Sequence, residues 1–205
     1  MNIDLNETAT AARPDPVAAT PAELDAALLR EIARGNQLAM RTLFMRHQVR
    51  VYRFVMRFVR DRGQAEDIVS EVFLAVWQQA NRFKGRSSVS TWLLSIARHK
   101  ALTAIKRPPA EPLDGDAAAA IADPALDPEA RIDRSDSGAM LRRCLDALSR
   151  EHGEMIDLVY YQQKSIKEIV DILGIPPNTV KTRMFYARKR LAALLGAAGV
   201  DCAPT

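Results

Sequence analysis

The feature that most constrains this fold is an acidic, proline-rich segment, residues 108–138, in the middle of the chain. It contains five prolines and eight acidic residues against two arginines. Few large apolar side chains are left in it to offset the conformational entropy of an ordered chain. We therefore expect a flexible acidic linker here, so that the rest of the chain must form its structure in two separate halves.

Both halves have apolar side chains at the three- and four-residue spacing of amphipathic helices. In the first half this spacing runs from Glu23 to Lys106, and in the second it resumes at Ala139. Strand signals are weak, because the sequence has no run of alternating β-branched residues and no Asn-Gly hairpin turn. The expected fold class is all-α, with two small helical domains on either side of the linker.

These patterns divide the 205-residue chain into five segments. In order they are a disordered N-terminal tail, a helical bundle, the acidic linker, a second helical domain and a C-terminal tail, with the ranges 1–22, 23–107, 108–138, 139–196 and 197–205. Within the bundle we expect a first helix that buries Leu24, Leu28 and Ile32, a second from Leu38 to Val59, and a last one from Ser90 to Lys106 with Ile105 facing inward.

The composition argues against an enzyme and against a membrane protein. Three histidines, two cysteines and the lack of a Gly-rich phosphate loop offer no arrangement for a metal, a nucleophile or a nucleotide. We therefore expect no catalytic residues, no metal and no cofactor. The polar N-terminus lacks an apolar signal sequence, and the apolar stretches are far shorter than the ~20 residues that span a bilayer. With no disulfide framework either, a cytoplasmic protein without membrane insertion is expected.

The most specific stretch is "SIKEIVDILGIPPNTVKTRMFYARKRL", residues 165–191. Ser165 and Glu168 form a capping-box pattern, Gly174 permits the left-handed backbone that ends a helix, and Pro177 suits the first turn of the next one. The first helix is expected to bury Ile166, Ile169, Val170 and Leu173. Two short helices joined by a tight turn, the second one basic, predict a helix-turn-helix.

The second of these helices is expected to enter the major groove of DNA, where base pairs differ chemically. The sequence has no acidic residue between Asp171 and Asp201, so the exposed side of this helix is uniformly cationic. The predicted DNA-binding residues are Lys181, Thr182, Arg183, Phe185, Tyr186, Arg188 and Lys189. A solvated cationic helix in a bundle is the alternative interpretation of the same residues.

The first half has a second acid-free run, "RFKGRSSVSTWLLSIARHKALTAIKR", from Arg82 to Arg107. It carries seven cations, with Phe83 and Trp92 among them. Trp92 shares a helical face with Ile96 and is expected to be core.

Three motifs together resemble the two modules of the bacterial sigma-70 family of RNA polymerase sigma factors, in its extracytoplasmic-function (ECF) group. They are "AEDIVSEVFLAVWQ", "RFKGRSSVSTWLLSIARHKAL" and the helix-turn-helix stretch, and the resemblance covers residues 23–196. It implies an alternative sigma factor that binds core RNA polymerase through its clamp and flap regions. It also implies that promoter DNA is a partner and that an anti-sigma factor controls the protein.

The resemblance also assigns roles to residues. The first module would melt the −10 element and hold it as single strands, for which cationic and aromatic surfaces are suited; its expected DNA-binding residues are Lys84, Gly85, Arg86, Ser87, Ser88, Arg98 and Lys100. The second module would read the −35 element as duplex. The "AEDIVSEVF" helix would dock on polymerase through Glu66, Asp67, Glu71 and Gln78.

A different class of protein is the main alternative: a helix-turn-helix transcriptional regulator whose N-terminal half senses a signal or dimerises. The acid-free run from Arg82 to Arg107 separates the two hypotheses, because a sensing module has no need of it. The acidic linker is likewise either a plain solvated tether or a segment that passes through a positively lined groove.

Overall fold

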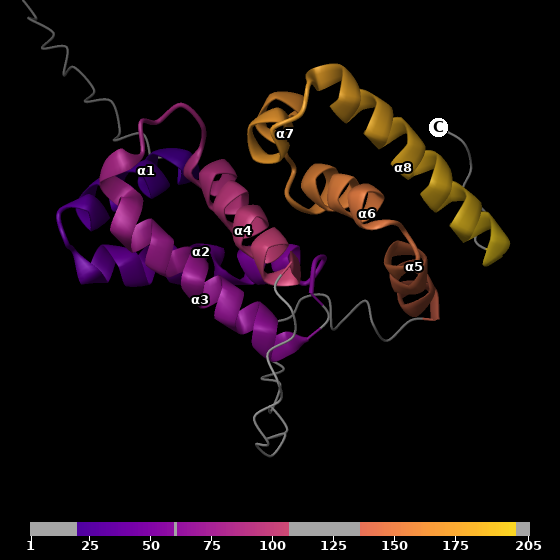
Figure 1. Cartoon of the computed structure of the whole chain (residues 1–205), viewed down its shortest axis with the longest axis horizontal. Helices are drawn as coiled ribbons and strands as arrows, with labels where there is room; N and C mark the ends of the chain where they lie inside the picture. Colours follow the sequence, from indigo (N-terminus) through magenta and orange to yellow (C-terminus); the bar gives the residue numbers. More distant parts are fainter. Residues whose placement is uncertain (1–19, 60, 107–135, 200–205) are drawn as a thin grey trace, which may run out of the picture.

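The computed structural model describes residues 20–59, 61–106 and 136–199, and these residues are helical, with turns and short loops but no strand. Figure 1 shows two groups of helices side by side. The first group contains α1 (Pro21–Ala33), α2 (Gln37–Val55), α3 (Arg62–Gln79), the short 3-10 helix η1 (Ala80–Arg82) and α4 (Val89–Lys106). The second contains α5 (Asp136–Asp146), α6 (Arg150–Ile156), the π-helical segment η4 (Asp157–Tyr161), α7 (Ile166–Leu173) and α8 (Pro177–Ala197). The all-α expectation is confirmed.

We call the first group the N-terminal module and the second the C-terminal module. The predicted N-terminal tail as far as residue 19, the acidic linker from 107 to 135 and the chain end from 200 lie outside the described residues. Helix α5 begins at Asp136, before the expected restart at Ala139.

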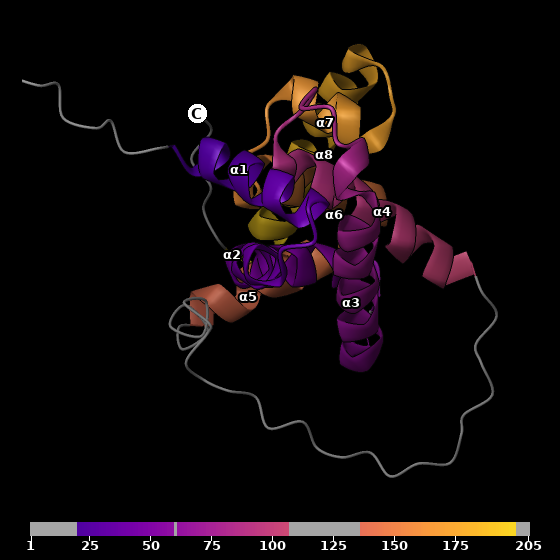
Figure 2. The ribbon, with the colours of Figure 1, turned by 90° about the vertical axis from the view of Figure 1, so that its left-hand side faces the viewer.

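Helices α2, α3 and α4 pack together around one apolar core. In Figure 2 helix α2 is seen almost end-on while α3 runs across the view, so the two helices cross steeply. Buried side chains of α3 at three- and four-residue intervals, Ile68, Val72 and Val76, meet Val51 of α2 and Leu93 of α4 in this core. The expected second helix is shorter than predicted, since α2 ends at Val55, although Val59 is still buried in the turns that follow. Ile105, expected inside, is exposed near the end of α4.

Helix α1 is fixed to α2 by a buried polar cluster. The Asp25 carboxylate accepts a hydrogen bond from Arg46 Nε at 2.8 Å, and its other oxygen lies 2.8 Å from His47 Nε2. Burial lowers the pKa of His47, against the opposing attraction of Asp25. The prediction that Leu24 is buried was wrong, because Asp25 occupies the inward position and Leu29 and Ile32 supply the apolar contacts.

The helix-turn-helix begins and ends as its sequence predicts. Ser165 and Glu168 form a complete capping box at the start of α7. Gly174 ends α7 with a φ of 67°, in the left-handed region, and Pro177 is the first residue of α8. The buried face of α7 is centred on Ile169, so at about 100° per residue its neighbours are Ile172 and Leu173. Ile166, predicted to be buried, lies at the edge of that face and is exposed.

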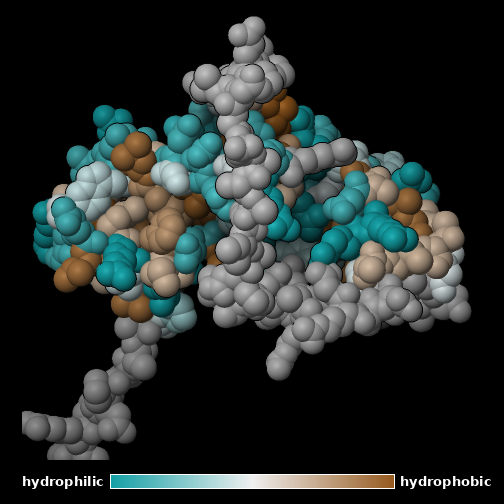
Figure 3. Space-filling view, turned by 90° about the horizontal axis from the view of Figure 1, so that it is seen from below, coloured by the Kyte–Doolittle hydropathy of each residue, from teal (hydrophilic) through white to brown (hydrophobic). Residues whose placement is uncertain are grey.

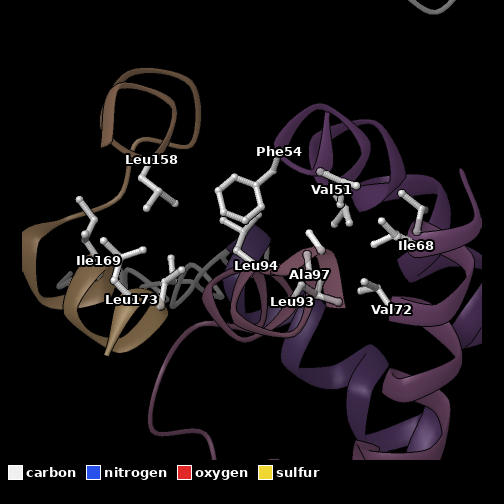
Figure 4. Close-up of a cluster of buried hydrophobic side chains, with 14 of the residues drawn as sticks. Val51, Phe54, Ile68, Val72, Leu93, Leu94, Ala97, Leu158, Ile169 and Leu173 are labelled. Atoms are coloured by element: carbon white, nitrogen blue, oxygen red, sulfur yellow. The ribbon is translucent and has the colours of Figure 1, made fainter. Parts of the chain in front are cut away.

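The two modules are in direct contact. Helix α4 packs against α2 and α3 on one side and against α7 on another. Figure 4 shows Leu94 of α4 and Phe54 of α2 beside Leu158, Ile169 and Leu173 of the C-terminal module, and all five side chains belong to one continuous buried cluster.

The outer surface is mainly hydrophilic. Figure 3 shows hydrophilic side chains over much of the described surface of both modules, with hydrophobic patches most visible on the N-terminal one. Among residues 20–59, 61–106 and 136–199, no helix has the length and apolar character required to cross a membrane.

The Asp25 cluster gives a stability prediction. Asp25→Ala leaves the buried His47 and the partly buried Arg46 without their shared hydrogen-bond acceptor, and a buried polar group without a partner typically costs about 1–3 kcal/mol. Urea unfolding followed by circular dichroism should therefore show a free energy of unfolding lowered by a few kcal/mol. Glu31→Ala is the matched control, because it removes an exposed pair with Arg34 worth ~0–1 kcal/mol. An equal, small effect of both substitutions would contradict a structural role for the cluster.

Candidate nucleic-acid interface

Helix α8 presents a cationic and aromatic surface. Its inner side is anchored by the buried side chains of Val180, Met184 and Ala187. Six of the seven predicted DNA-binding residues are exposed on the rest of the helix: Lys181, Thr182, Phe185, Tyr186, Arg188 and Lys189. The rings of Phe185 and Tyr186 pack edge to face with centroids 5.4 Å apart, so this surface offers two exposed aromatic rings beside its cations.

Arg183 is the exception on this helix. It is half-buried, and its Nη2 atom lies 3.5 Å from Glu151 Oε2 of α6. The guanidinium therefore faces α6 rather than standing with the exposed cations, and a contact with a base would compete with this ion pair.

The loop between η1 and α4 is the second predicted DNA-binding element. Lys84, Gly85 and Arg86 are exposed at its tip and Ser87 is half-buried. Gly85 has a φ of 66°, a left-handed conformation that glycine adopts without a steric cost, so it sets the direction of this turn.

Two aromatic side chains support the loop. The rings of Phe83 and Trp92 have centroids 5.2 Å apart, and both residues are half-buried against the hydrophobic core. The prediction that Trp92 is core is therefore only partly right. The aromatic pair stiffens the base of the loop and keeps part of its surface accessible.

Beside Phe83 lies a shallow cavity of about 270 Å³ between α1 and η1. Arg30, Arg34 and Asn81 line it together with apolar side chains. Arg30 and Arg34 thus place cationic side chains of α1 near Phe83, although the sequence motifs did not include α1 in the site.

Ser88 has a role that differs from the predicted one. Its Oγ accepts a hydrogen bond from the Thr91 backbone N–H at 3.3 Å, as a cap for the start of α4. The same hydroxyl lies 3.1 Å from Glu168 Oε1 in the C-terminal module. Ser88 therefore sits between the modules in this arrangement, whereas Lys84, Gly85 and Arg86 face solvent.

The two predicted DNA-binding cations of α4, Arg98 and Lys100, are both paired with acids. Arg98 Nε donates to Glu154 Oε1 of α6 at 2.6 Å. Burial raises the pKa of Glu154, and the hydrogen bond from Arg98 opposes that shift. Lys100 Nζ donates to Glu71 Oε2 at 2.9 Å, so a residue predicted to bind DNA pairs with one predicted to bind polymerase.

Lys164 and Glu168 form a polar centre that the sequence motifs did not point to. Lys164 Nζ lies 2.7 Å from Ser90 Oγ, 3.0 Å from Thr91 Oγ1 and 3.0 Å from Glu168 Oε1. Burial lowers the pKa of Lys164, against the attraction of Glu168. Burial alone would raise the pKa of Glu168, but hydrogen bonds from Thr91, the Ser165 backbone and Lys164 bring it down to about 2.

The predicted polymerase-docking residues share the exposed side of α3. Glu66, Asp67, Glu71 and Gln78 are all exposed. Leu74 was not predicted, yet it is 56% exposed and lies three residues after Glu71 and four before Gln78, on the same helical face. An apolar side chain thus stands in the middle of an acidic, polar surface.

The described residues contain no group of three or more His, Cys, Asp or Glu side chains placed to hold a metal ion. Cys144 is a buried free thiol. Cys202 lies outside the described residues.

Comparisons with known proteins agree with this geometry. Residues 43–108 match the model of Sigma-70 region 2, and residues 138–191 match that of Sigma-70, region 4. Helix α1 precedes both matches, although it packs into the same bundle as α2 and α4.

Similar curated proteins are ECF RNA polymerase sigma factors. SigK of Mycobacterium tuberculosis (strain ATCC 25618 / H37Rv) is 33% identical over 172 residues, which cover 82% of this chain and 91% of that protein. SigK of Mycolicibacterium vanbaalenii is 31% identical over 180 residues, which cover 86% of this chain and 91% of that protein.

Two solved structures are similar over most of their length. CnrH in complex with the cytosolic domain of CnrY has a TM-score of 0.63 and 25% identity, covering 85% of this chain and 98% of that one. The sigma factor RpoE of Bartonella quintana, in complex with the anti-sigma factor NepR, has a TM-score of 0.56 and 18% identity, covering 76% of this chain and 96% of that one, and shows the fold alone.

The match of residues 43–108 argues against the alternative of a helix-turn-helix regulator with an unrelated sensing half. Together, the two matched regions and the relatives of similar length show that this chain belongs to the sigma-70 family, among the ECF RNA polymerase sigma factors.

Proposed function

We propose that this chain binds core RNA polymerase and directs initiation at promoters by dividing two tasks between its modules. The N-terminal module, residues 23–107, opens the −10 element, and the C-terminal module, residues 139–196, reads the −35 element as duplex. The observation that carries the proposal is that one chain has two separate cationic surfaces, the loop at 84–86 and the exposed side of α8. A protein that binds a single stretch of DNA needs only one.

We also propose where the protein acts and what controls it. The chain acts in the cytoplasm as an initiation factor without catalytic activity of its own. The predicted tails and tether are shorter than the ranges 1–22, 108–138 and 197–205, because α1 begins at Pro21, α5 begins at Asp136 and α8 ends at Ala197. CnrH has been solved with the cytosolic domain of CnrY, and the sigma factor RpoE with the anti-sigma factor NepR. Both are similar to this chain in structure, which supports control of this chain by an anti-sigma partner.

We assign recognition of the −35 duplex to the N-terminal half of α8. In a helix-turn-helix the second helix lies in the major groove with its first turns toward the base edges. Lys181, Thr182 and Phe185 are exposed there, while Arg188 and Lys189 follow further along the helix toward the phosphates. Phe185 adds an apolar group that suits a thymine methyl.

Opening of the −10 element falls to the loop before α4. Lys84 and Arg86 are placed to hold the phosphates of a separated strand, and an unpaired base stacked on an aromatic ring recovers ~1–3 kcal/mol. Phe83 and Trp92 supply accessible ring surface at the base of the loop. Extruding a base costs a few kcal/mol, so one stacked base with flanking phosphate contacts offsets that cost.

Docking on polymerase falls to α3. Its exposed face combines the carboxylates of Asp67 and Glu71 with the apolar side chain of Leu74. An apolar group at the centre of a polar rim is the usual anatomy of a protein interface, so we add Leu74 to the polymerase-binding residues.

The docking assignment predicts the effect of Leu74→Ser. Burying a leucine contributes about 1.5–3 kcal/mol, so the dissociation constant for core polymerase should rise roughly 10- to 100-fold. Leu38→Ser is the matched control, because Leu38 is an exposed leucine of the same module on α2. Fluorescence anisotropy titrations with core polymerase measure both, and equal affinities for the two variants would contradict the assignment.

Lys181→Ala tests duplex reading. A cation that contacts a base edge should cost about 1–3 kcal/mol and relax the choice at one position of the −35 element, whereas a phosphate contact weakens binding to all sequences alike. Binding to a set of duplexes with single base changes separates the two results. Arg62→Ala removes one exposed charge from the N-terminal module and should leave the sequence preference unchanged.

The double substitution Arg86→Ala with Ser87→Ala tests promoter opening. It should reduce the permanganate reactivity of thymines in the −10 element several-fold, with little change in duplex binding by the holoenzyme, because both residues belong to the melting loop. Arg41→Ala, an exposed arginine of α2, is the control. Normal permanganate reactivity in the double variant would remove the loop from the opening step.

A further inference from the structure

The outer side of α2 carries an apolar surface that neither DNA binding nor polymerase docking uses. It consists of Leu38, Thr42, Met45 and Val49, spaced four, three and four residues apart, and we call these four residues the α2 seam. Leu38 is 75% exposed, Met45 61% and Val49 36%. Residues at this spacing lie on the same side of a helix, so the α2 seam is one continuous surface.

The α2 seam can be covered without leaving a polar group unpaired. Its hydroxyl, Thr42 Oγ1, donates to the backbone carbonyl of Leu38 at 2.9 Å, as Ser and Thr hydroxyls commonly do within helices. At its edge, Gln48 Nε2 donates to Met45 Sδ at 3.6 Å. Apolar groups of another helix can therefore pack on the α2 seam without the cost of an unsatisfied hydroxyl.

The surroundings of the α2 seam are positively charged. Between Glu31 and Asp61 the sequence has seven arginines and no acidic residue. Two of these arginines, Arg41 and Arg50, are exposed on α2. Charge complementarity favours a partner whose apolar groups are surrounded by acids, and like charges placed face to face are unfavourable. Two α2 seams would therefore repel each other.

The outer side of α3 has the complementary pattern. Asp67, Glu71, Leu74 and Gln78 follow one another at the same four, three and four residues, and all of them are exposed. We call these four residues the α3 seam. Leu74 is 56% exposed among these carboxylates, and Glu66 adds a further acid beside them. Helices whose contacting side chains repeat every three and four residues can pack along each other.

One molecule cannot bring its own two seams together. Val51 of α2 and Val72 of α3 are buried in the core that these helices share. At about 100° per residue, the α2 seam and the α3 seam lie on the far sides of their helices from these two valines. The acidic partner of the α2 seam must come from another molecule, and a second copy of this chain carries one.

We propose that the chain self-associates head to tail: the α2 seam of one copy packs on the α3 seam of a second copy, with Arg41 and Arg50 facing the acids around Leu74. In a two-fold symmetric pair this contact occurs twice, since each copy contributes both seams. The contact is small and involves side chains that stay partly hydrated, so we expect a dissociation constant in the micromolar range.

Self-association competes with polymerase docking. The α3 seam is the surface that the proposed function assigns to polymerase, so this consequence rests on the proposed function, whereas the contact between copies does not. A copy whose α3 seam is covered by a second copy is not available to polymerase. At high concentration, part of the protein is thus held in reserve until free polymerase takes it up.

Sedimentation velocity of the full chain at about 1 to 100 μM tests the contact without DNA or polymerase. A reductant prevents disulfides between copies. The weight-average sedimentation coefficient of the unaltered chain should rise with concentration. Met45→Glu should keep the coefficient at the monomer value, because it places an acid against the acids of the α3 seam.

Ile105→Glu is the control for this measurement. Ile105 is an exposed apolar residue of α4 outside both seams, so the variant should associate like the unaltered chain. Circular dichroism melts check that both variants are folded. An unaltered chain that stays monomeric throughout would overturn the proposal and leave the α2 seam to a different protein. A Met45→Glu variant that associates as strongly as Ile105→Glu would overturn it as well.

Mixing two variants tests which surfaces meet. Met45→Glu keeps an intact α3 seam and Leu74→Glu keeps an intact α2 seam, so neither should associate alone. An equimolar mixture restores one contact between the two seams, and its sedimentation coefficient should exceed that of either variant alone. A mixture that stays monomeric would show that α2 does not meet α3 of another copy and would refute the head-to-tail contact.

Energy transfer between donor-labelled and acceptor-labelled copies tests the competition. The labels are placed through Ala192→Cys, an exposed position of α8 outside both seams, with Cys144→Ala and Cys202→Ser as background. An excess of core polymerase should lower the transfer as it binds. Unchanged transfer with polymerase bound would rule out the competition. If polymerase does not bind at all, the proposed function fails, while sedimentation still decides whether the copies associate.

Discussion

The structure depends on helix α4 being buried on two faces. Leu93 and Ala97 hold it in the N-terminal bundle, and Thr91, Leu94 and Arg98 hold the C-terminal module against it. A helix with two packed faces has little surface left for a third partner. The same helix follows the melting loop directly, so the position of the C-terminal module and the availability of the promoter-binding residues are physically linked.

Charge pairing decides which cations are available in this arrangement. Lys84, Arg86 and the exposed cations of α8 face solvent, whereas Arg98, Lys100 and Arg183 are each paired with an acid. A net charge of +4 therefore understates how selectively the protein presents positive charge. Pairs that solvent reaches, such as Lys100 with Glu71, exchange readily with a phosphate. Arg98 with the buried Glu154 does not, because separating them without rearrangement would leave a charge buried alone.

The sequence predicts local features correctly where all the residues that cause the feature lie in one short segment. The capping box at Ser165, the left-handed turn at Gly174 and the start of α8 at Pro177 each depend on a few consecutive residues. Burial was predicted less well. Leu24 and Ile166 both fit an apolar helical spacing, yet both are exposed. Their helices bury Asp25 in α1 and Ile172 in α7 instead. Spacing defines a face of a helix, and only the partner decides where that face is centred.

The sequence by itself determined the helices, the division into two modules and the exposed cations of α8 and of the loop, because helical periodicity, capping and missing acids are properties of neighbouring residues. Only the tertiary structure decided that Lys164 and Glu154 are buried against α4 and Asp157 against the turn that follows α2, and that Leu74 stands alone on the outer side of α3. Glu154 bonds to a residue 56 positions away, and Lys164 to one 73 positions away. The physical reason is that a charged side chain is buried only where a partner compensates its charge. Here that partner lies far away in the sequence, so a pattern of neighbouring residues does not reveal it.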